Sequence, residues 1–486
     1  MTAPNELEEL AQPDPVVASE IHLNRALGPV SLIMIGIGSI IGAGIFVYAG
    51  TAAATHAGPA VLLSFAIAGV GCLFAGLCYA EFASMIPESG SSYTYAYATM
   101  GRFMAWFIGW NMVLEYGVSA SGVAAGWSGY FVSFLHHMGI AFPAAFANAP
   151  IEGHGLHDIH WTGAVVNLPA VVLIVGLTAL LVVGMRESAR FNNVMVMVKV
   201  GIVLAVILFG LPYVASSNFT PFIPPNTGQF GHFGITGILA GAGIVFFAFI
   251  GFEAVSVAAQ ECKNPRRDLP IGILGSLFIC TTLYVLIAIV LIGIADWRTL
   301  DVPNPVSFAV GKNPALAWLV QWVNVAALAG LGTVVFTSLY GQTRIFYSMA
   351  RDGFLPPAFH AVHKRFHTPH RGTIIIGTLA AVLAALFPFD VLADLVSIGT
   401  LFAFIAVCLG IMILRVTTPK ATRKFRTPWV WFVAPAGVGV CGLMMYSLSD
   451  DTWVRLILWT VIGLVIYFTY GVWHALPSKW KVSNES

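Results

Sequence analysis

Four glycines interrupt an apolar segment near the start of the chain that is long enough to cross a lipid bilayer. The segment GIGSIIGAGIF covers residues 36–46 and carries glycine at positions 36, 38, 42 and 44. Glycine weakens a helix, and a break that faced lipid would leave backbone amides and carbonyls without hydrogen-bond partners. Such a break is tolerated where the freed groups line a protein cavity or hold a ligand. The segment therefore predicts an unwound helix with a ligand site, although glycines that only allow close helix packing are the alternative.

Apolar segments of spanning length recur along the whole chain of 486 residues. Hydrophobic residues make up 58% of the sequence and charged residues 9%, a balance that a soluble protein of this size could not bury. The lipid bilayer is therefore a partner of the chain. We predict an all-α integral membrane fold with twelve transmembrane helices at about 29–54, 59–86, 103–135, 163–185, 189–212, 233–259, 268–295, 315–348, 372–388, 391–416, 429–449 and 452–474.

Basic residues predict how these helices are oriented, because Lys and Arg are retained on the cytoplasmic side during insertion. With a cytoplasmic N-terminus, only Arg298, Lys312 and Arg455 fall outside, and Lys199 falls within a helix. We therefore expect a multi-pass protein of the inner (plasma) membrane with both termini in the cytoplasm. The acidic N-terminal tail lacks the basic leader of a cleaved signal peptide.

A second interruption is predicted five helices after the first, in the segment FFAFIGFE at residues 246–253. Two broken helices at corresponding positions of two five-helix units are typical of inverted-repeat transporters, whose binding site lies between them near the middle of the membrane. An odd number of helices in each unit inverts the second copy. The predicted domains are a cytoplasmic tail at 1–28, a transporter domain at 29–474 with repeats 29–212 and 233–416 and extra helices at 429–474, and a cytoplasmic tail at 475–486.

Other classes of function lack support in the sequence. No basic surface with interleaved aromatic residues indicates nucleic-acid binding. The six cysteines show no metal or dithiol spacing, and for His154, His157 and His160 a solvated loop is favoured over a weak metal site. No nucleophile-base cluster indicates an enzyme, and paired interruptions fit an occluding carrier better than a channel. We therefore predict no catalytic residue, no metal and no cofactor.

Several short segments carry a family resemblance. They are GSIIGAGIF at 38–46, YAEF at 79–82, PESGSSY at 87–93, FAFIGFE at 247–253, ECKNP at 261–265, YGQTR at 340–344 and MARDG at 349–353. Together they closely resemble the amino-acid-polyamine-organocation superfamily, and within it the cationic amino acid transporter branch and its bacterial relatives. The resemblance covers about 29–416. It implies five-plus-five inverted repeats with two further helices, helices 1 and 6 unwound, and transport of L-amino acids by alternating access.

The first break suits the α-carboxylate of such a substrate. A half-helix that begins after Gly44 presents unpaired N–H groups and the positive end of its dipole, and Gly42 and Gly44 let the carboxylate approach the backbone. Carbonyls freed at both breaks are acceptors for the α-ammonium group. The predicted substrate-binding residues are Ile40, Ile41, Gly42, Ala43, Gly44, Glu115, Phe247, Ala248, Phe249, Ile250 and Glu253.

Lys199 lies about halfway along the predicted fifth helix. It lies too deep to reach either interface easily, so its ammonium group needs partners or must release its proton. In the resembling family, proton-coupled members carry a lysine in the fifth helix that contacts the unwound part of the first, near the sodium site of related symporters. Lys199 matches that position, which implies proton coupling through contacts near Gly36 and Ile37. A static brace is the alternative.

Three carboxylates fall within predicted helices. The resemblance places Glu115 beside the pocket, where it would meet a cationic side chain or join the proton path. Glu253 follows the second break, where capping of backbone amides explains it as well as substrate binding does. Glu81 lies near the cytoplasmic end of its helix, and we expect a gate or a structural ion pair with a loop arginine.

The preferred amino acid stays open. Phe249, Phe252 and residues 330–333 are candidates for the side-chain pocket or its gates, with ordinary core packing as the alternative for the phenylalanines. Glu115 would favour cationic substrates, whereas a small pocket would suit alanine, glycine or serine. We predict proton-coupled import of cationic or small neutral L-amino acids, with an exchanger or a sodium-coupled carrier of the same fold as the alternative. Stoichiometry, oligomeric state and any small accessory membrane subunit are left undecided.

Overall fold

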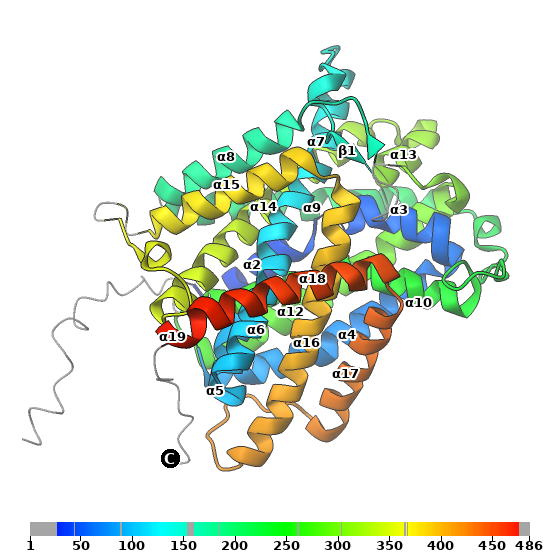
Figure 1. Cartoon of the computed structure of the whole chain (residues 1–486). Helices are drawn as coiled ribbons and strands as arrows, with labels where there is room; N and C mark the ends of the chain where they lie inside the picture. The colour runs from blue at the N-terminus through cyan, green and yellow to red at the C-terminus, as the bar shows by residue number, and fades with distance from the viewer. Residues whose placement is uncertain are drawn as a thin grey trace, which may run out of the picture.

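The computed structural model describes residues 27–475, except 43, 88–89, 153–159, 184, 260–261, 303, 364–365 and 367. It also leaves the side chains at 137, 185–191, 390 and 393–394 undescribed. In the described part nearly all regular structure is helical, as Figure 1 shows. The exception is a short antiparallel hairpin of β1 (Ile151–Glu152) and β2 (His160–Trp161). The predicted all-α class is confirmed.

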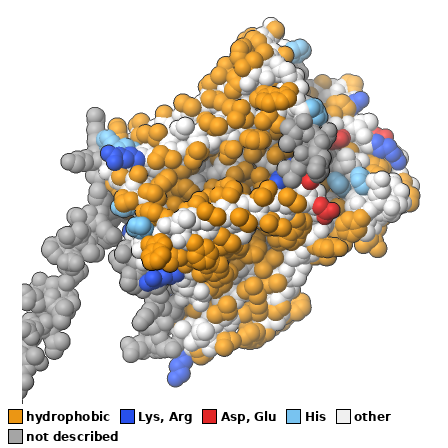
Figure 2. Space-filling view, viewed as in Figure 1, with side chains coloured by type: hydrophobic (Ala, Val, Ile, Leu, Met, Phe, Trp, Pro, Cys, Tyr) orange, Lys and Arg blue, Asp and Glu red, His pale blue; other side chains and the backbone are white. Residues whose placement is uncertain are grey.

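Seven helical segments of the described chain are long and apolar enough to cross a membrane. They are Gly44–Met85, Asn192–Tyr213, Gly234–Val257, Pro265–Ile294, Leu319–Arg351, Leu395–Thr417 and Asp450–His474. Shorter apolar helices accompany them at Pro29–Ile40, Leu168–Val183, His370–Leu386 and Val430–Tyr446. In Figure 2 apolar side chains cover most of the visible surface, while Lys, Arg, Asp and Glu gather toward its edges. The chain is therefore a multi-pass membrane protein.

The first half of the chain contains one interrupted helix, followed by longer continuous ones. Its elements are α2 (Pro29–Ile40), η1 (Gly44–Tyr48), α3 (Ala49–Thr51), η2 (Ala52–Ala57), η3 (Gly58–Ala60), α4 (Val61–Met85), α5 (Ser91–Met100), α6 (Arg102–Met112), η4 (Val113–Val118), α7 (Ser119–His137), η5 (Ala144–Phe146), α8 (Leu168–Val183), α9 (Met185–Gly210), η6 (Leu211–Tyr213) and η7 (Ser216–Phe219). Among these, η1, η2 and η4 are π-helical turns, which occur frequently at functional sites.

The second half begins with another interrupted helix. Its elements are α10 (Gly234–Val245), η8 (Phe246–Phe249), α11 (Ala254–Val257), α12 (Pro265–Ile294), η10 (Trp297–Thr299), α13 (Pro305–Lys312), η11 (Pro314–Leu316), α14 (Leu319–Arg351), η12 (Pro357–His360), α15 (His370–Leu386), α16 (Phe389–Thr417), α17 (Val430–Tyr446), α18 (Asp450–Ile466), η13 (Tyr467–Gly471) and α19 (Val472–His474). The two halves pack closely, because α12 lies against α2 and α4, and α14 lies against α7 and α9.

The last helices pack on the outside of this core. Helix α17 lies against α16 and α4, and α18 crosses in front of α16 in Figure 1 and contacts it. Only 22% of the apolar window of Asp450–His474 is buried, compared with 78% for Gly234–Val257. Most of the apolar surface of the last helical segment is therefore left unburied by the rest of the protein.

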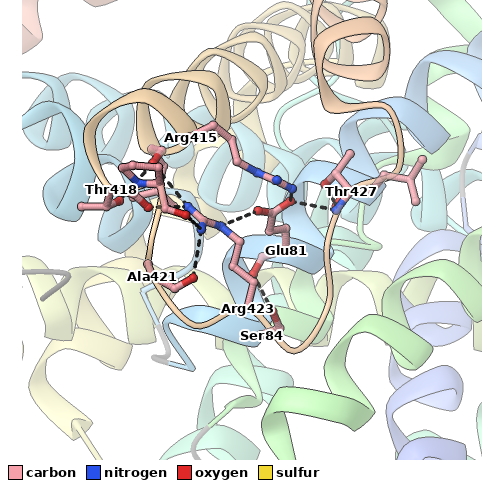
Figure 3. A network of polar contacts seen from close by, with 10 residues as sticks. Glu81, Ser84, Arg415, Thr418, Ala421, Arg423 and Thr427 are labelled. Atoms are coloured by element: carbon pink, nitrogen blue, oxygen red, sulfur yellow. Dashed lines mark hydrogen bonds and ion pairs between the residues drawn. The ribbon is translucent and has the colours of Figure 1, made fainter. Parts of the chain in front are cut away.

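A buried ion-pair network joins α4 to the loop between α16 and α17 (Figure 3). The Glu81 carboxylate lies 2.8 Å from Nη2 of Arg415 and 3.0 Å from Nε of Arg423, and it accepts a hydrogen bond from the Thr427 amide. The Arg423 guanidinium also donates to the carbonyls of Leu414 and Thr418 at the end of α16. The structural ion pair with a loop arginine predicted for Glu81 is confirmed.

Candidate functional site

The first helix is interrupted directly after Ile40. Ile41 adopts an extended conformation, with φ −74° and ψ 99°, and helical structure resumes at Gly44 as a π-helical turn. Gly42 lies between these two points, and Ala43 lies outside the described residues. The interruption therefore falls within the glycine segment, where the sequence predicts it.

The second helix is interrupted after a single 3₁₀ turn. Helix α10 ends at Val245, the turn η8 follows, and Ile250 is extended before α11 begins at Ala254. Gly251 has a φ of +121°, which a residue with a side chain rarely adopts. A Cβ at Gly251 would also lie 2.8 Å from the Ser39 backbone. Glycine is required here by conformation and by space.

The two interruptions touch each other. A Cβ at Gly44 would lie 2.0 Å from Cα of Ala248, far inside van der Waals contact. A Cβ at Gly42 would lie 2.6 Å from Cγ2 of Val334 on α14. The glycines thus let the two broken helices approach backbone to backbone and let a side chain of α14 pack against the first break.

A single tyrosine hydroxyl contacts both breaks. The Tyr284 hydroxyl, on α12, lies 2.8 Å from the carbonyl oxygen of Ile40 and 2.8 Å from that of Ala248. Tyr284 is buried, and its ring packs on Phe65 and Phe249. Sequence reasoning missed this residue, because one tyrosine within an apolar helix carries no pattern that separates it from core aromatics.

Lys199 binds the first break from α9. Its Nζ donates to the carbonyls of Gly38 at 2.6 Å and Ile41 at 2.8 Å, and to Oγ1 of Thr333 at 3.0 Å. An ammonium group has three N–H donors, and each has an acceptor here. The side chain is 0% exposed. Lys199 therefore ties the end of α2 to α14. The contacts predicted near Gly36 and Ile37 occur instead at Gly38, one residue past Ile37, and at Ile41, four residues past it, because α2 continues to Ile40 before the break.

A cavity of about 410 Å³ lies where the interruptions meet. The described residues that line it are Ser39, Ile40, Gly42, Gly44, Glu115, Tyr116, Ser119, Phe247, Ile250, Gly251, Glu253, Ala254, Val334, Thr337 and Ser338. None of these is Lys, Arg or His. Charge for a substrate carboxylate would therefore come from main-chain amides.

Most of the predicted binding residues line this cavity. Ile41 and Ala248 do not line it, because their carbonyls face Lys199 and Tyr284. Phe249 packs against Phe65 and Tyr284 instead of lining the cavity. The polar residues of α14 that line it, Thr337 and Ser338, were not singled out from the sequence, because Ser and Thr are common in membrane helices.

Two carboxyl groups meet at the cavity wall. Glu253 is 1% exposed, and its carboxylate accepts a hydrogen bond from the Gly251 amide at 3.0 Å and lies 3.5 Å from the Tyr116 hydroxyl. Glu115 sits in the π-helical turn η4 and is 2% exposed. Both of its carboxyl oxygens are buried without a hydrogen-bond partner among the described residues, and both glutamates line the cavity.

Three aromatic rings close one end of the cavity. Tyr48, Phe247 and Phe389 pack together with centroid distances of 5.0 to 5.9 Å. Phe247 lines the cavity, whereas Tyr48 and Phe389 line two larger hollows beyond it. A second hollow, between α2, α9 and α14, shares Ser39, Ala254 and Thr337 with the cavity. The cavity thus adjoins the three packed rings and this second hollow.

A family model described as amino acid permease matches residues 27–468, nearly the whole described chain. The chain belongs to this family. The predicted resemblance is thereby confirmed, and the permease is a transporter, not an enzyme.

Its relatives carry several substrate names. The methylthioribose transporter of Bacillus subtilis (strain 168) is 43% identical over 460 residues, which cover 94% of this chain and 95% of the relative. The branched-chain amino acid permease BcaP of the same organism is 43% identical over 459 residues, with 94% and 95% covered. The vacuolar cationic amino acid transporter 4 of Arabidopsis thaliana is 38% identical over 398 residues, with 82% and 64% covered.

Proposed function

We propose that the permease imports L-amino acids by proton-coupled alternating access, with the substrate held between the two interruptions. The observation that carries this proposal is the contact of two broken helices around a cavity whose described lining has no Lys, Arg or His. The carboxylate end of a zwitterion then meets no basic side chain among the described lining residues, which leaves main-chain amides and their dipoles to bind it. The names of the relatives BcaP and cationic amino acid transporter 4 support an amino acid substrate.

The α-carboxylate binds the amides at the start of the second half of the first helix. The helical segment that begins at Gly44 directs its unpaired N–H groups and its positive dipole end toward the break. The α-ammonium group binds carbonyls of Phe247 and Ile250, with that of Ile40 as a further acceptor. A carbonyl oxygen has two lone pairs, so the contact with Tyr284 leaves one for the substrate.

Lys199 couples this site to protons. A charged ammonium holds Gly38, Ile41 and Thr333 together, and loss of its proton removes one donor and the charge that strengthens the others. The end of α2 is then released from α14. Proton binding therefore shifts the equilibrium between states in which opposite sides of the cavity are closed.

The remaining architecture follows from the sequence analysis. We propose twelve spans in two inverted repeats, 29–212 and 233–416, with extra helices at 429–474 at the periphery. Both termini lie in the cytoplasm of a cell whose inner (plasma) membrane holds the permease. With this orientation the Tyr48, Phe247 and Phe389 rings form the outer gate, and the hollow between α2, α9 and α14 leads to the cytoplasm.

Uptake into proteoliposomes tests the proposal. Labelled alanine is offered under a proton gradient, a sodium gradient or no gradient, with and without internal amino acid. We expect accumulation to follow the proton gradient and to need no internal substrate. Accumulation that follows only the sodium gradient would contradict proton symport and favour a sodium-coupled carrier. Accumulation that occurs only with internal amino acid would contradict it and favour an exchanger.

Competition by unlabelled compounds tests the substrate class. Alanine, lysine and leucine should compete, whereas an amino acid methyl ester should not, because it lacks the carboxylate that the first break binds. Methylthioribose serves as a second probe, since a relative bears that name. Competition by methylthioribose with none by any amino acid would refute zwitterion binding.

A further inference from the structure

The protein supplies hydrogen-bond donors to the carboxyl group of Glu253 but not to that of Glu115. Glu253 receives the Gly251 amide and lies near the Tyr116 hydroxyl, so donors are present for its ionised form. Neither oxygen of Glu115 receives a hydrogen bond from a described donor group. The Glu253 carboxyl group lines the same cavity, and a buried carboxyl group that has neither a donor nor a cation beside it is more stable protonated than ionised. With the cavity empty, Glu115 therefore carries a proton.

No described cation offsets a second negative charge at this pair. The titratable side chains that feel the charge of this pair are Tyr79 and Cys72 of α4 and Tyr116 of η4, and all three are neutral near pH 7. Helices α6, α7, α14, α15 and α16 pack against η4, and none of their described charged groups acts on Glu115. The Lys199 ammonium donates its three hydrogen bonds elsewhere, to the carbonyls of Gly38 and Ile41 and to the Thr333 hydroxyl. Two adjacent ionised carboxylates at this buried site would repel strongly.

A substrate side chain can supply the missing charge, because both glutamates line the cavity proposed to bind the amino acid. We propose that Glu115 exchanges its proton for the positive charge of a cationic substrate: it carries a proton with a neutral amino acid and gives the proton to water when a lysine or arginine side chain binds. This rests on the proposed function. The summed charge of the two carboxyl groups and the substrate side chain is the same in both complexes, so one site accepts both substrate classes.

Proton counting follows from this exchange. A neutral amino acid travels with the Glu115 proton, whereas a cationic one travels without it. Uptake of alanine should therefore carry one proton more per substrate than uptake of lysine. Any proton carried by Lys199 adds equally to both ratios. The difference between the proton-to-alanine and proton-to-lysine ratios thus reports on Glu115 alone. The number of protons that both substrates share reports on Lys199.

Equilibrium binding gives a second measurement of the same exchange. Lysine binding expels a proton, so the affinity for lysine relative to alanine should rise by up to about tenfold per pH unit while Glu115 is protonated in the empty cavity. Purified full-length permease is titrated with labelled lysine and labelled alanine over a pH series. The ratio of the two dissociation constants cancels any pH effect that acts on both substrates.

Three variants make the test specific. Glu115→Gln cannot ionise, so lysine affinity should fall by about tenfold or more, alanine should still bind, and the pH dependence of the ratio should vanish. Glu115→Asp restores an ionisable group and should restore that dependence. Asp296→Asn, a carboxyl-to-amide change at an exposed residue, is the matched control. It should leave the proton-to-substrate ratios and the ratio of the two dissociation constants unchanged.

The outcomes separate the two proposals. Equal proton ratios for alanine and lysine in the unaltered permease, failure of lysine to bind, or unchanged lysine affinity in Glu115→Gln would each overturn the exchange. Loss of proton-driven alanine uptake would instead refute the coupling proposed above. If Lys199 played no part in coupling, uptake of alanine would still carry one proton more per molecule than uptake of lysine.

Discussion

The closest approach between the two interruptions makes Gly44→Ala a sharp test of the site. A Cβ at this position would lie 2.0 Å from Cα of Ala248, whereas ordinary contact begins at 3.4 Å. The two backbones would have to separate by about 1.4 Å, the difference between these distances. Since the obstacle is backbone and not a flexible side chain, no rotamer change relieves it. A misplacement of about 1 Å in a binding constellation costs on the order of 100-fold in rate.

We therefore expect Gly44→Ala to lower the initial rate of alanine uptake by about 100-fold. Initial rates are measured in proteoliposomes that contain equal amounts of folded, monodisperse permease. Gly42→Ala should be milder, because its obstacle is a methyl group of Val334. Gly201→Ala in α9 is the matched control, since no atom lies within 4 Å of its added Cβ. Uptake by Gly44→Ala equal to that of Gly201→Ala would refute the contact between the breaks as a requirement for transport.

Other predictions concern the residues that hold the site in place. Lys199→Gln keeps polar contacts but has no titratable charge, so alanine uptake should lose its response to an imposed proton gradient, and an unchanged response would contradict coupling. Tyr284→Phe leaves two buried carbonyls without their hydroxyl partner, at a cost of about 1–3 kcal/mol, and alanine affinity measured by equilibrium binding should fall. Glu81→Gln weakens a buried ion-pair network, for which loss of a partner costs about 3–5 kcal/mol. Thermal unfolding in detergent should therefore occur at a lower temperature than in Asp296→Asn, where the exposed ion pair contributes about 0–1 kcal/mol.

The interruptions were predictable because backbone N–H and C=O groups without hydrogen-bond partners are too costly in lipid. Glycine at 36–46 and the segment 246–253 mark positions where a continuous helix is unfavourable inside lipid. The buried position of Lys199 was predictable for a similar reason, since one cation within an apolar helix must find partners. The carbonyls that it binds, Gly38 and Ile41, could only be placed approximately, because the end of α2 depends on how the break is packed.

Contacts between distant segments were beyond sequence reasoning. Tyr284 reaches both breaks only because α12 packs against α2 and α4, and nothing local distinguishes it from other buried aromatics. The sequence analysis weighed Glu115 and Glu253 separately, and their position at one cavity depends on the π-helical turn η4. Phe249 and Phe247 look alike in sequence, yet only Phe247 lines the cavity.

An experimental structure of the permease with bound L-alanine would test the central claim most directly. The account predicts the amino acid between the two interruptions, with its carboxylate on amides near Gly42 and Gly44 and its ammonium group on carbonyls of Phe247 and Ile250. No Lys or Arg side chain should contact the carboxylate. Alanine bound elsewhere, or held by an ion pair between its carboxylate and a basic side chain, would contradict the account.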